Sequence, residues 1–347
     1  MNAPRDPKAA RYARQVTFKK IGLEGQEKLL DARVALIGAG ALGASVAEQL
    51  VRSGVGHVVI VDRDVVEESN LGRQSLYVEA DAAARLPKAV ALRQHLLAFN
   101  PTVDVVARVA DVRSDTIDDL LEEPDLVIDG TDNFATRYLL NDWCVREDVP
   151  WIYGGCVGAR GLSAVIIPGE TPCLRCLFRD PPPPGSVETC ETTGIIAPAA
   201  TMIAALEVAE ALKLLVGDAR SVRRGYISVD LWPFRVASVG AESKPDADCP
   251  TCGRRQFVFL EGGARDRVVT YCGRDAVQVI PAGRRTVNLA SLCERLADVG
   301  DVSTNGFALT LRVPQHEITV FDDGRALIRG TRDPAHARVL YDRYVGS

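Results

Sequence analysis

Two Cys-x-x-Cys pairs carry the clearest chemical signal in the sequence. The first pair is Cys173 and Cys176, and the second is Cys249 and Cys252. Four thiolates make a closed tetrahedral zinc site, which is structural because it leaves no ligand position for a substrate. The long stretch between the pairs exceeds the spacing of a simple zinc ribbon, so a redox role for one pair stays open on spacing alone. Pro250 and the loop-like surroundings of both pairs favour zinc.

A glycine-rich loop offers a second place for chemistry. Gly38, Gly40 and Gly43 follow the apolar run 33–37 and open a helical segment, and Asp62 ends the next apolar run, nineteen residues after Gly43. Such glycines let the backbone approach phosphate, the helix N-terminus favours an anion, and the carboxylate accepts ribose hydroxyls. The rival interpretation is a helix–strand contact that needs glycine only for packing. The pattern predicts a nucleotide site, and it leaves NAD and ATP open. No Gly-Lys-Ser/Thr P-loop is present.

Further polar motifs follow in order along the chain. They are Arg63-Asp64, Ser69-Asn70-Leu71-Gly72-Arg73-Gln74, Leu86-Pro87-Lys88 at a predicted helix start, and Asp129-Gly130-Thr131-Asp132-Asn133 after a predicted strand. With these motifs the chain resembles the ThiF/MoeB family of ubiquitin-like-protein activating enzymes over roughly residues 8–253. The opening Arg11-Tyr12-Ala13-Arg14-Gln15 is similar to the N-terminal arm of that family, and the four paired cysteines match its zinc positions.

The resemblance implies an ATP-dependent adenylyltransferase. In such a reaction a C-terminal carboxylate attacks the α-phosphate of ATP and expels pyrophosphate, so fixed cations and a metal ion must offset the negative charge. By resemblance, Arg73 and Lys88 hold the phosphates, and Asp132 holds Mg²⁺. The resemblance also implies that Asp62 binds the ribose and that Asn70 and Gln74 orient the phosphates. It implies that Asp64 assists the metal or the nucleotide, and that Arg14 reaches the active site of a partner subunit. Taken singly, each is also typical of a surface charge or a helix cap.

Cys190 follows a run of prolines and precedes a long apolar stretch. Family members that transfer their activated partner carry a cysteine here on a mobile loop. The resemblance therefore implies that its thiolate attacks the acyl-adenylate or forms an acyl-disulfide during sulfur delivery. A spare loop thiol is the alternative. Cys144, Cys156 and Cys293 lie in apolar stretches and are predicted to be packing residues.

Alternating strands and helices must position these side chains. Continuous apolar runs separated by helical segments predict a right-handed βαβ unit at the glycine loop and an α/β fold, with a mostly parallel Rossmann-like sheet covered by helices on both faces. Pro181–Pro184 predicts an exposed loop. The predicted helices are 44–52, 88–99, 116–121, 134–147 and 197–215, and the predicted strands are 33–37, 57–61, 103–108, 126–128, 151–153, 162–167, 226–229 and 234–239.

The character of the chain changes near residue 255. We expect an adenylation domain with the zinc site, 1–254, and a small α+β C-terminal domain, 255–347. Asp322-Asp323-Gly324 predicts a hairpin turn. Some relatives end in a rhodanese domain, but the nearest candidate for its active cysteine, Cys272, is better interpreted as a turn cysteine. A docking role for this domain is a hypothesis. Its predicted strands are 268–272, 276–280, 307–313, 317–321 and 326–328, and its predicted helices are 289–297 and 334–344.

Bulk composition limits the classes of function. The 347 residues are 47% hydrophobic and 25% charged, with a formal net charge of −5. This balance argues against a surface that coats nucleic acid. No apolar run is long enough to cross a bilayer, and the polar N-terminus lacks a signal-peptide core. We therefore expect a cytoplasmic protein with no nucleic-acid or membrane partner.

The resemblance to the ThiF/MoeB family implies adenylation of the C-terminal Gly-Gly carboxylate of a small β-grasp sulfur-carrier protein of the ThiS/MoaD type. The product serves thiamine, molybdopterin or related sulfur transfer; a cysteine desulfurase or a rhodanese is the candidate sulfur donor, and a homodimer is expected. Three alternatives remain: a relative that adenylates a small molecule or a modified tRNA base, an NAD-dependent oxidoreductase, and an inactive scaffold subunit. The four histidines offer no evident hydride-handling group. Arg73, Lys88 and Asp132 together argue against an inactive scaffold.

Overall fold

The structure is a computed structural model. It describes residues 6, 8–182, 188, 190–240, 244–262, 267–270, 275–282 and 286–346, with the side chains of 190–191 and 267–270 left aside. The chain divides into two compact units. The first consists of residues 1–83 and 87–262, and the second of residues 84–86 and 263–347. The functional division into 1–254 and 255–347 stays a prediction.

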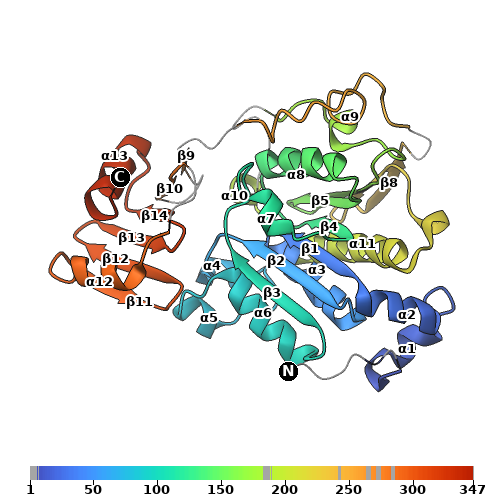
Figure 1. Ribbon diagram of the computed structural model, residues 1–347, viewed down its shortest axis with the longest axis horizontal. Helices are drawn as coiled ribbons and strands as arrows, with labels where there is room; N and C mark the ends of the chain where they lie inside the picture. The colour runs from blue at the N-terminus through green and yellow to red at the C-terminus, as the bar shows by residue number, and fades with distance from the viewer. Residues whose placement is uncertain are drawn as a thin grey trace. The chain divides into compact units, whose positions relative to one another are not determined.

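An eight-stranded sheet of order β3-β2-β1-β4-β5-β6-β7-β8 forms the centre of the first unit (Figure 1). β1 to β5 run parallel, and β6, β7 and β8 continue the sheet antiparallel. The predicted α/β fold with a mainly parallel sheet is thereby confirmed. The strands are β1 (Arg33–Ile37), β2 (His57–Asp62), β3 (Asp104–Val109), β4 (Leu126–Asp129), β5 (Trp151–Val157), β6 (Arg160–Ile166), β7 (Tyr226–Asp230) and β8 (Arg235–Val239).

Helices flank this sheet. α7 and α8 share one apolar cluster with the β1 and β4 side chains Ala35, Ile37 and Val127, whereas α3 and α11 pack on each other and on β5. Because helices cover both faces, the β4 strand is buried along its whole length. The helices of the unit are η1 (Ala10–Tyr12), α1 (Ala13–Thr17), α2 (Gly22–Asp31), α3 (Ala41–Ser53), α4 (Glu68–Leu71), α5 (Glu79–Ala83), α6 (Lys88–Phe99), α7 (Ile117–Leu121), α8 (Phe134–Arg146), α9 (Leu174–Leu177), α10 (Cys190–Thr193), α11 (Ala197–Val216) and η2 (Ala219–Ser221).

Several elements differ from the prediction. α4, α5, α9 and α10 were not predicted, because four or five residues are too few to show helical periodicity. β5 extends to Val157 rather than Tyr153, since β6 pairs with it antiparallel through Gly154 and Gly155, which have low strand propensity of their own. Pro181 and Pro182 are half-buried rather than exposed, and 183–184 lie outside the described residues.

The second unit is a six-stranded antiparallel sheet of order β11-β12-β13-β14-β10-β9. α12 (Leu289–Leu296) and α13 (Pro334–Tyr344) share one apolar core with it. The predicted turn at 322–324 joins two strands that pair as a hairpin. β11 was missed because its short polar sequence lacks an alternating apolar pattern, and Cys272 lies outside the described residues. The strands are β9 (Arg267–Thr270), β10 (Ala276–Ile280), β11 (Asp301–Thr304), β12 (Ala308–Val313), β13 (His316–Phe321) and β14 (Ala326–Arg329).

Cysteines outside the two pairs behave mostly as packing residues. Cys144 is fully buried in the first unit's core, and Cys293 packs at the edge of the second unit's core. Cys156 on β5 is half-buried. Within the described parts of the chain, no helix is both long and apolar enough to cross a membrane.

The face of α11 that meets the sheet carries a buried carboxyl group, Glu207. A Cβ atom added at Gly154 would lie 2.3 Å from Glu207 Oε1, so the carboxyl group fits here only because β5 has a glycine. Neither oxygen of Glu207 has a hydrogen-bond partner in the described part of the chain. Burial, with Asp129 adding to it, raises the pKa of Glu207 well above its ordinary value.

Replacing this carboxyl group should change how stability depends on pH. A raised pKa means that the stability contributed by protonated Glu207 is complete below pH ~4.5, the ordinary carboxyl value, and is lost as pH rises through the folded-state pKa. Glu207→Gln should therefore match the wild type near pH 5 and exceed its unfolding free energy by on the order of 1–2 kcal/mol at pH 8. Urea unfolding at both pH values measures this. The exposed control Glu27→Gln should show no such gain, and a Glu207→Gln gain of equal size at both pH values would contradict the prediction.

Candidate nucleotide and metal sites

Three glycines bring two loops of the first unit into backbone contact. Gly38 has a φ of +93°, and a Cβ atom there would lie 2.6 Å from the Gly130 carbonyl oxygen. A Cβ atom at Gly43 would lie 1.9 Å from the Gly38 carbonyl oxygen. The Gly130 N–H also donates to the Ile37 carbonyl at 2.7 Å. The loop after β1 and the loop after β4 are therefore packed together at the carboxyl ends of neighbouring parallel strands, where α/β sheets bind ligands.

The N-terminus of α3 is open beside these glycines. Gly40 is the N-cap residue and provides no side-chain cap, and a Cβ atom there would meet nothing within 4 Å. Unpaired N–H groups at the start of a thirteen-residue helix attract an anion. The glycine loop predicted from sequence thus has both the space and the polarity for a phosphate group.

Asp62, at the end of β2, braces the glycine loop. One carboxylate oxygen accepts from the Ala39 N–H at 2.6 Å, and the other accepts from the Asp64 N–H at 2.7 Å. Burial raises the pKa of Asp62, an effect that nearby Lys88 opposes and Asp64 reinforces. Each carboxylate oxygen of Asp62 keeps a second lone pair that can accept a hydrogen bond from a ribose hydroxyl. Ribose binding by Asp62 stays a prediction.

Lys88, the first residue of α6, is a buried cation. Its side chain donates to Asp64 Oδ2 at 3.1 Å, and its backbone N–H donates to the Asp64 carbonyl at 2.8 Å. Burial by itself would lower the pKa of Lys88, but Asp64 and Asp62, with a smaller contribution from Asp132, outweigh it and raise the pKa. Lys88 therefore keeps its charge throughout the physiological pH range.

Asn70 and Gln74 provide buried polar atoms without partners. Asn70 Oδ1 accepts from the Glu67 N–H at 3.0 Å, which closes a capping box on α4. Asn70 Nδ2 and Gln74 Oε1 make no hydrogen bond to any described residue, although both atoms are buried. An unpaired buried polar atom costs about 1–3 kcal/mol. A polar ligand that supplies an acceptor and a donor would remove that cost, so this pair fits a bound nucleotide.

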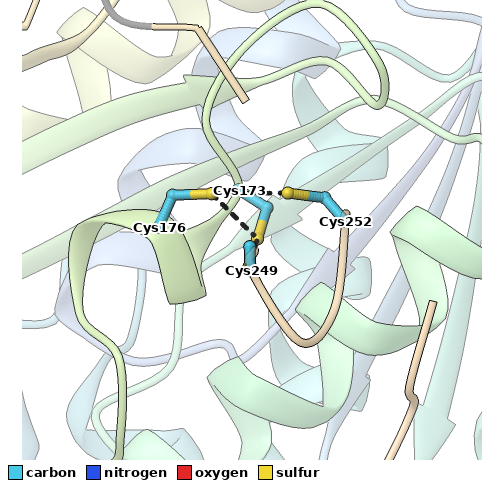
Figure 2. A group of neighbouring side chains, drawn as sticks. All are labelled: Cys173, Cys176, Cys249 and Cys252. Atoms are coloured by element: carbon cyan, nitrogen blue, oxygen red, sulfur yellow. Dashed lines mark hydrogen bonds between the residues drawn. The ribbon is translucent and has the colours of Figure 1, made fainter. Parts of the chain in front are cut away.

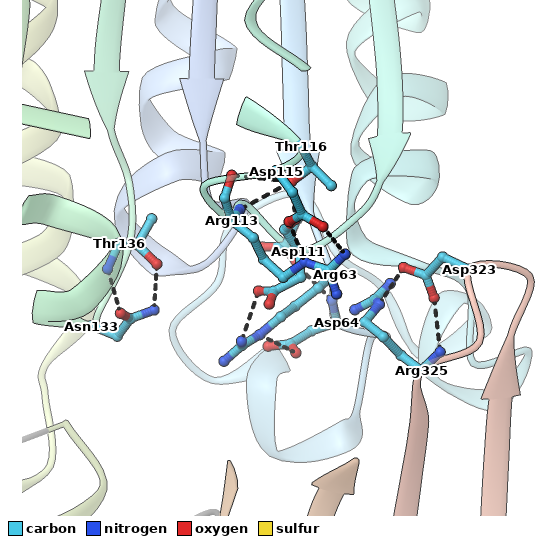
Figure 3. A network of polar contacts seen from close by, with 11 residues as sticks. Arg63, Asp64, Asp111, Arg113, Asp115, Thr116, Asn133, Thr136, Asp323 and Arg325 are labelled. Carbon is cyan, nitrogen blue, oxygen red and sulfur yellow. Dashed lines mark hydrogen bonds and ion pairs between the residues drawn. The ribbon is translucent and has the colours of Figure 1, made fainter. Parts of the chain in front are cut away.

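Arg73 lies between these two residues. It is half-buried, and its guanidinium donates to the Ser69 carbonyl at 2.7 Å, four residues earlier. Asp132 lies exposed in the loop after β4, next to Asn133, whose side chain accepts from the Thr136 N–H at 2.8 Å and caps α8 (Figure 3). Asp132 contributes to the charge environment of Lys88 from this loop.

Two arginines to which the sequence analysis gave no role, Arg63 and Arg113, form ion pairs in the polar network that includes Asp64. Arg63 Nη1 lies 2.9 Å from Asp111 Oδ1, and Arg63 Nε lies 3.9 Å from Asp64 Oδ1. Arg113 pairs with Asp115 at 3.0 Å (Figure 3). Arg63 belongs to the Arg63-Asp64 motif, but its ion-pair partner Asp111 is 48 positions away in the sequence. Only the folded structure shows that these two side chains pair.

Arg137 is a second residue that sequence reasoning missed. It lies in the first turn of α8, 5% exposed, and its Nε donates to Asp129 Oδ2 at 2.9 Å. Its Nη2 donates to the carbonyls of Thr131 at 2.7 Å and Gly154 at 2.9 Å. Asp129 in turn accepts from the Thr131 hydroxyl at 2.6 Å. These bonds fix the loop that carries Asp132. The signal that the sequence offered was an arginine close to the start of the predicted helix 134–147, a few residues after the Asp129–Asn133 motif.

The four paired cysteines converge on one point (Figure 2). The Sγ–Sγ distances are 3.9 Å for Cys173–Cys176, 3.6 Å for Cys173–Cys249 and 3.3 Å for Cys176–Cys252. A tetrahedron with Zn–S bonds of about 2.3 Å has edges of ~3.8 Å. The side-chain amide of Asn141 donates to Cys173 Sγ at 3.8 Å. This donor set fits zinc, and the separation exceeds the ~2 Å of a disulfide.

Comparisons with known proteins show the family to which the chain belongs. The chain matches the ThiF family over residues 12–251, a segment that contains the residues of the nucleotide site and three of the four clustered cysteines; Cys252 lies one residue beyond it. It belongs to the ThiF family. Over 338 residues it is 42% identical to the sulfur carrier protein ThiS adenylyltransferase of Bacillus subtilis, which covers 97% of this chain and 99% of that protein. It is 39% identical over 260 residues to the sulfur carrier protein adenylyltransferase of Thermus thermophilus, which covers 72% of this chain and 94% of that protein.

A solved structure shows the same fold. Escherichia coli MccB, in a crystal structure with ATP, matches the chain with a TM-score of 0.62 and 24% identity, over 72% of this chain and 76% of MccB. The match to the ThiF family and the 42% identity to the Bacillus subtilis protein confirm the family membership predicted from the ordered motifs.

The structure describes no side-chain contact between the nucleotide site and either Arg14 or Cys190, the two remaining predicted site residues of this ThiF-family chain. Arg14 is exposed on α1, and its side chain makes no hydrogen bond or ion pair with another described residue. The backbone of Cys190 begins α10, but its side chain lies outside the described residues. The segment after α10 is anchored, because the Gly158 N–H donates to the Gly194 carbonyl at 2.8 Å and the Ile196 N–H donates to the Gly158 carbonyl at 3.0 Å.

The cysteine cluster should bind one structural zinc. Purified protein should contain about one zinc per chain, and Cys249→Ser should lower both the zinc content and the melting temperature, because the metal joins two distant segments. Elemental analysis and thermal unfolding measure the two effects. Cys293→Ser, outside the cluster, is the matched control and should keep its zinc. Folded wild-type protein free of zinc and other metals would refute the assignment.

The Asp129–Arg137 pair should support stability strongly. Arg137→Met leaves a buried carboxylate without its cation, so we expect a loss of about 3–5 kcal/mol in unfolding free energy. The double variant Arg137→Met with Asp129→Asn should recover part of it, because the buried charge is gone. Arg146→Met, on the same helix but in a surface ion pair, should cost less than about 1 kcal/mol. Equal losses for Arg137→Met and Arg146→Met in urea unfolding would contradict this account.

Proposed function

We propose that this chain is an ATP-dependent adenylyltransferase that activates the C-terminal Gly-Gly carboxylate of a small β-grasp sulfur-carrier protein and releases pyrophosphate. One observation carries the proposal. Lys88, a buried and permanently charged ammonium, stands with Asp62 and Asp64 beside the open N-terminus of α3. The relatives named as sulfur-carrier adenylyltransferases support the carrier protein as substrate, and the best covered of them matches 97% of this chain.

In this reaction the residues of the site divide the work by their charge. The α3 N-terminus and Lys88 face the phosphates, and Arg73 reaches them by leaving the Ser69 carbonyl. Adenylation collects negative charge as pyrophosphate departs, so these fixed cations stabilise the transition state more than the ground state. Magnesium, when bound by Asp132, supplies further neutralisation of the phosphates.

The remaining polar residues orient the nucleotide. Asn70 Nδ2 donates to the ligand, and Gln74 Oε1 accepts from it, which satisfies the two buried atoms that are otherwise unpaired. Asp62 holds the glycine loop through the Ala39 N–H and accepts a ribose hydroxyl with its remaining lone pairs. Asp64 keeps Lys88 in place, which leaves the ammonium positioned before ATP arrives.

Outside the nucleotide site we assign four further roles. Zinc at the cysteine cluster is structural, because four protein ligands fill the tetrahedron. Cys190 takes part in acyl or sulfur transfer, with a cysteine desulfurase or a rhodanese as sulfur donor. Arg14 completes the active site of a second subunit in a homodimer, to which its exposure on α1 leaves it accessible. The C-terminal domain docks the carrier or the donor. A cytoplasmic location stays a prediction.

Neither of the two histidines in the first unit, both of them described, is placed beside the glycine loop as the oxidoreductase alternative would favour. His57 begins β2, at the opposite end of that strand from Asp62. His95 on α6 lies 2.8 Å from Asp81 Oδ2. The other two histidines, His316 and His336, pack edge-to-face in the second unit.

Pyrophosphate exchange tests the proposal directly. Exchange of labelled pyrophosphate into ATP should require a carrier that ends in Gly-Gly, and truncating that tail should abolish it. Asp132→Ala should lower the exchange rate by at least about 100-fold, because the phosphates lose a metal ligand, while circular dichroism shows an unchanged fold.

The control is Asp31→Ala, which removes an exposed carboxylate at the end of α2 and should leave exchange unchanged. Near-normal activity of Asp132→Ala would refute its metal role. Exchange without any carrier tail would indicate a small-molecule or tRNA substrate instead. Binding of NAD with no binding of ATP would overturn the proposal.

A further inference from the structure

Tyr77 lies buried between the two halves of the nucleotide site. Its side chain is 6% exposed, and its hydroxyl donates to the Ala39 carbonyl at 2.7 Å. The same hydroxyl lies 3.3 Å from the Lys88 carbonyl, a second and longer contact for its single proton. One phenol thus touches both the glycine loop and the first turn of α6, segments that are remote in sequence.

The peptide groups on either side of Ala39 are held from two directions. The Ala39 N–H donates to Asp62, and its carbonyl accepts from Tyr77. Ala39 is fully buried, so water cannot replace a lost donor at that carbonyl. Asp62 therefore fixes the entry to the glycine loop, and Tyr77 fixes the peptide that leads into Gly40, the N-cap residue of α3.

The backbone before Tyr77 is strained. Leu76 has a φ of +79°, a left-handed conformation that costs a non-glycine residue about 1–2 kcal/mol. Just before it, Ser75 Oγ lies 3.1 Å from Ser45 Oγ on the first turns of α3. The segment is thus tied to α3, turns sharply at Leu76 and directs the Tyr77 ring inward. Strain of this kind persists where the surrounding contacts enforce a particular placement.

We propose that Tyr77 is a positioning residue of the adenylation site, whose hydroxyl holds the glycine loop and the start of α6 in register so that the α3 N-terminus and Lys88 face the same phosphate chain. The inference rests on the proposed binding of ATP at this site. Tyr77 acts through Ala39 and Lys88 and need not touch the nucleotide. Burial, with Asp62, Asp81 and Asp64 adding to it, raises the pKa of Tyr77 well above its ordinary value, so the hydroxyl remains a donor at every functional pH.

Tyr77→Phe tests the role, because it removes one oxygen and keeps the ring. The chain offers two matched controls in which a tyrosine hydroxyl donates to a backbone carbonyl: Tyr138, to Phe178 at 2.8 Å, and Tyr341, to Gly324 at 2.7 Å. All three Phe variants should lose similar stability. Only Tyr77→Phe should raise the KM for ATP, by about tenfold for the loss of one well-placed hydrogen bond, with the carrier KM within about twofold of wild type.

Calorimetric titration with ATP separates this inference from the proposed function. If the wild type binds no ATP, the proposed function fails, and this inference fails with it. If the wild type binds ATP and Tyr77→Phe binds it equally well, the positioning role alone is overturned. Should Tyr77→Phe not fold, Ser75→Ala loosens the same segment more gently. It should raise the ATP dissociation constant by about two- to threefold, and an unchanged constant there would also overturn the inference.

Discussion

The contact among Gly38, Gly43 and Gly130 is the constraint on which the nucleotide site depends. The Gly38 carbonyl would lie 1.9 Å from a Cβ atom at Gly43, so no other residue fits there without moving the backbone. Through this contact the loop that opens α3 and the loop that carries Asp132 share one position at the end of β1 and β4. The N–H groups proposed to bind phosphate and the Asp132 carboxylate proposed to bind magnesium thus lie on adjoining loops, because glycine lacks a side chain.

The glycine contact is accompanied by charged side chains that are already in position in the protein without ligand. Lys88 is buried, and it holds its charge because Asp64 and Asp62 stabilise the ammonium more than burial penalises it. Reorganising solvent around a charged group during a reaction is costly, and a cation already desolvated and oriented avoids that cost. The buried ion pair Asp129–Arg137 holds the neighbouring loop in place, because Arg137 also donates to the Thr131 carbonyl, one residue before Asp132.

The sequence predicted what local spacing encodes. The glycine loop, the paired cysteines and most long elements of the first unit follow from patterns within a few residues, and the ordered motifs gave the family. Residues whose partners are remote escaped that reasoning: Tyr77 meets a carbonyl 38 positions away, and Arg137 bonds to Gly154, 17 positions away. Glu207 escaped for a further reason, because a carboxyl group in an apolar helix gives no sign that glycine on a neighbouring strand makes room for it.

The residues of the site fall into two groups: side chains that hydrogen-bond within the fold, and side chains that keep a buried polar atom without a described partner. Arg137 and Tyr77 act on backbone, and their donors reach carbonyls or a carboxylate within the fold. Asn70 Nδ2 and Gln74 Oε1 are instead buried without a hydrogen-bond partner among the residues that the structure describes. A buried polar group without a partner destabilises the free protein, but a ligand that hydrogen-bonds to it removes that penalty. Such a group therefore favours ligands that carry the matching donor or acceptor. The amides of Asn70 and Gln74 are therefore the groups that we propose to meet the nucleotide, whereas Arg137 and Tyr77, whose hydrogen bonds are made within the fold, form the scaffold of the site.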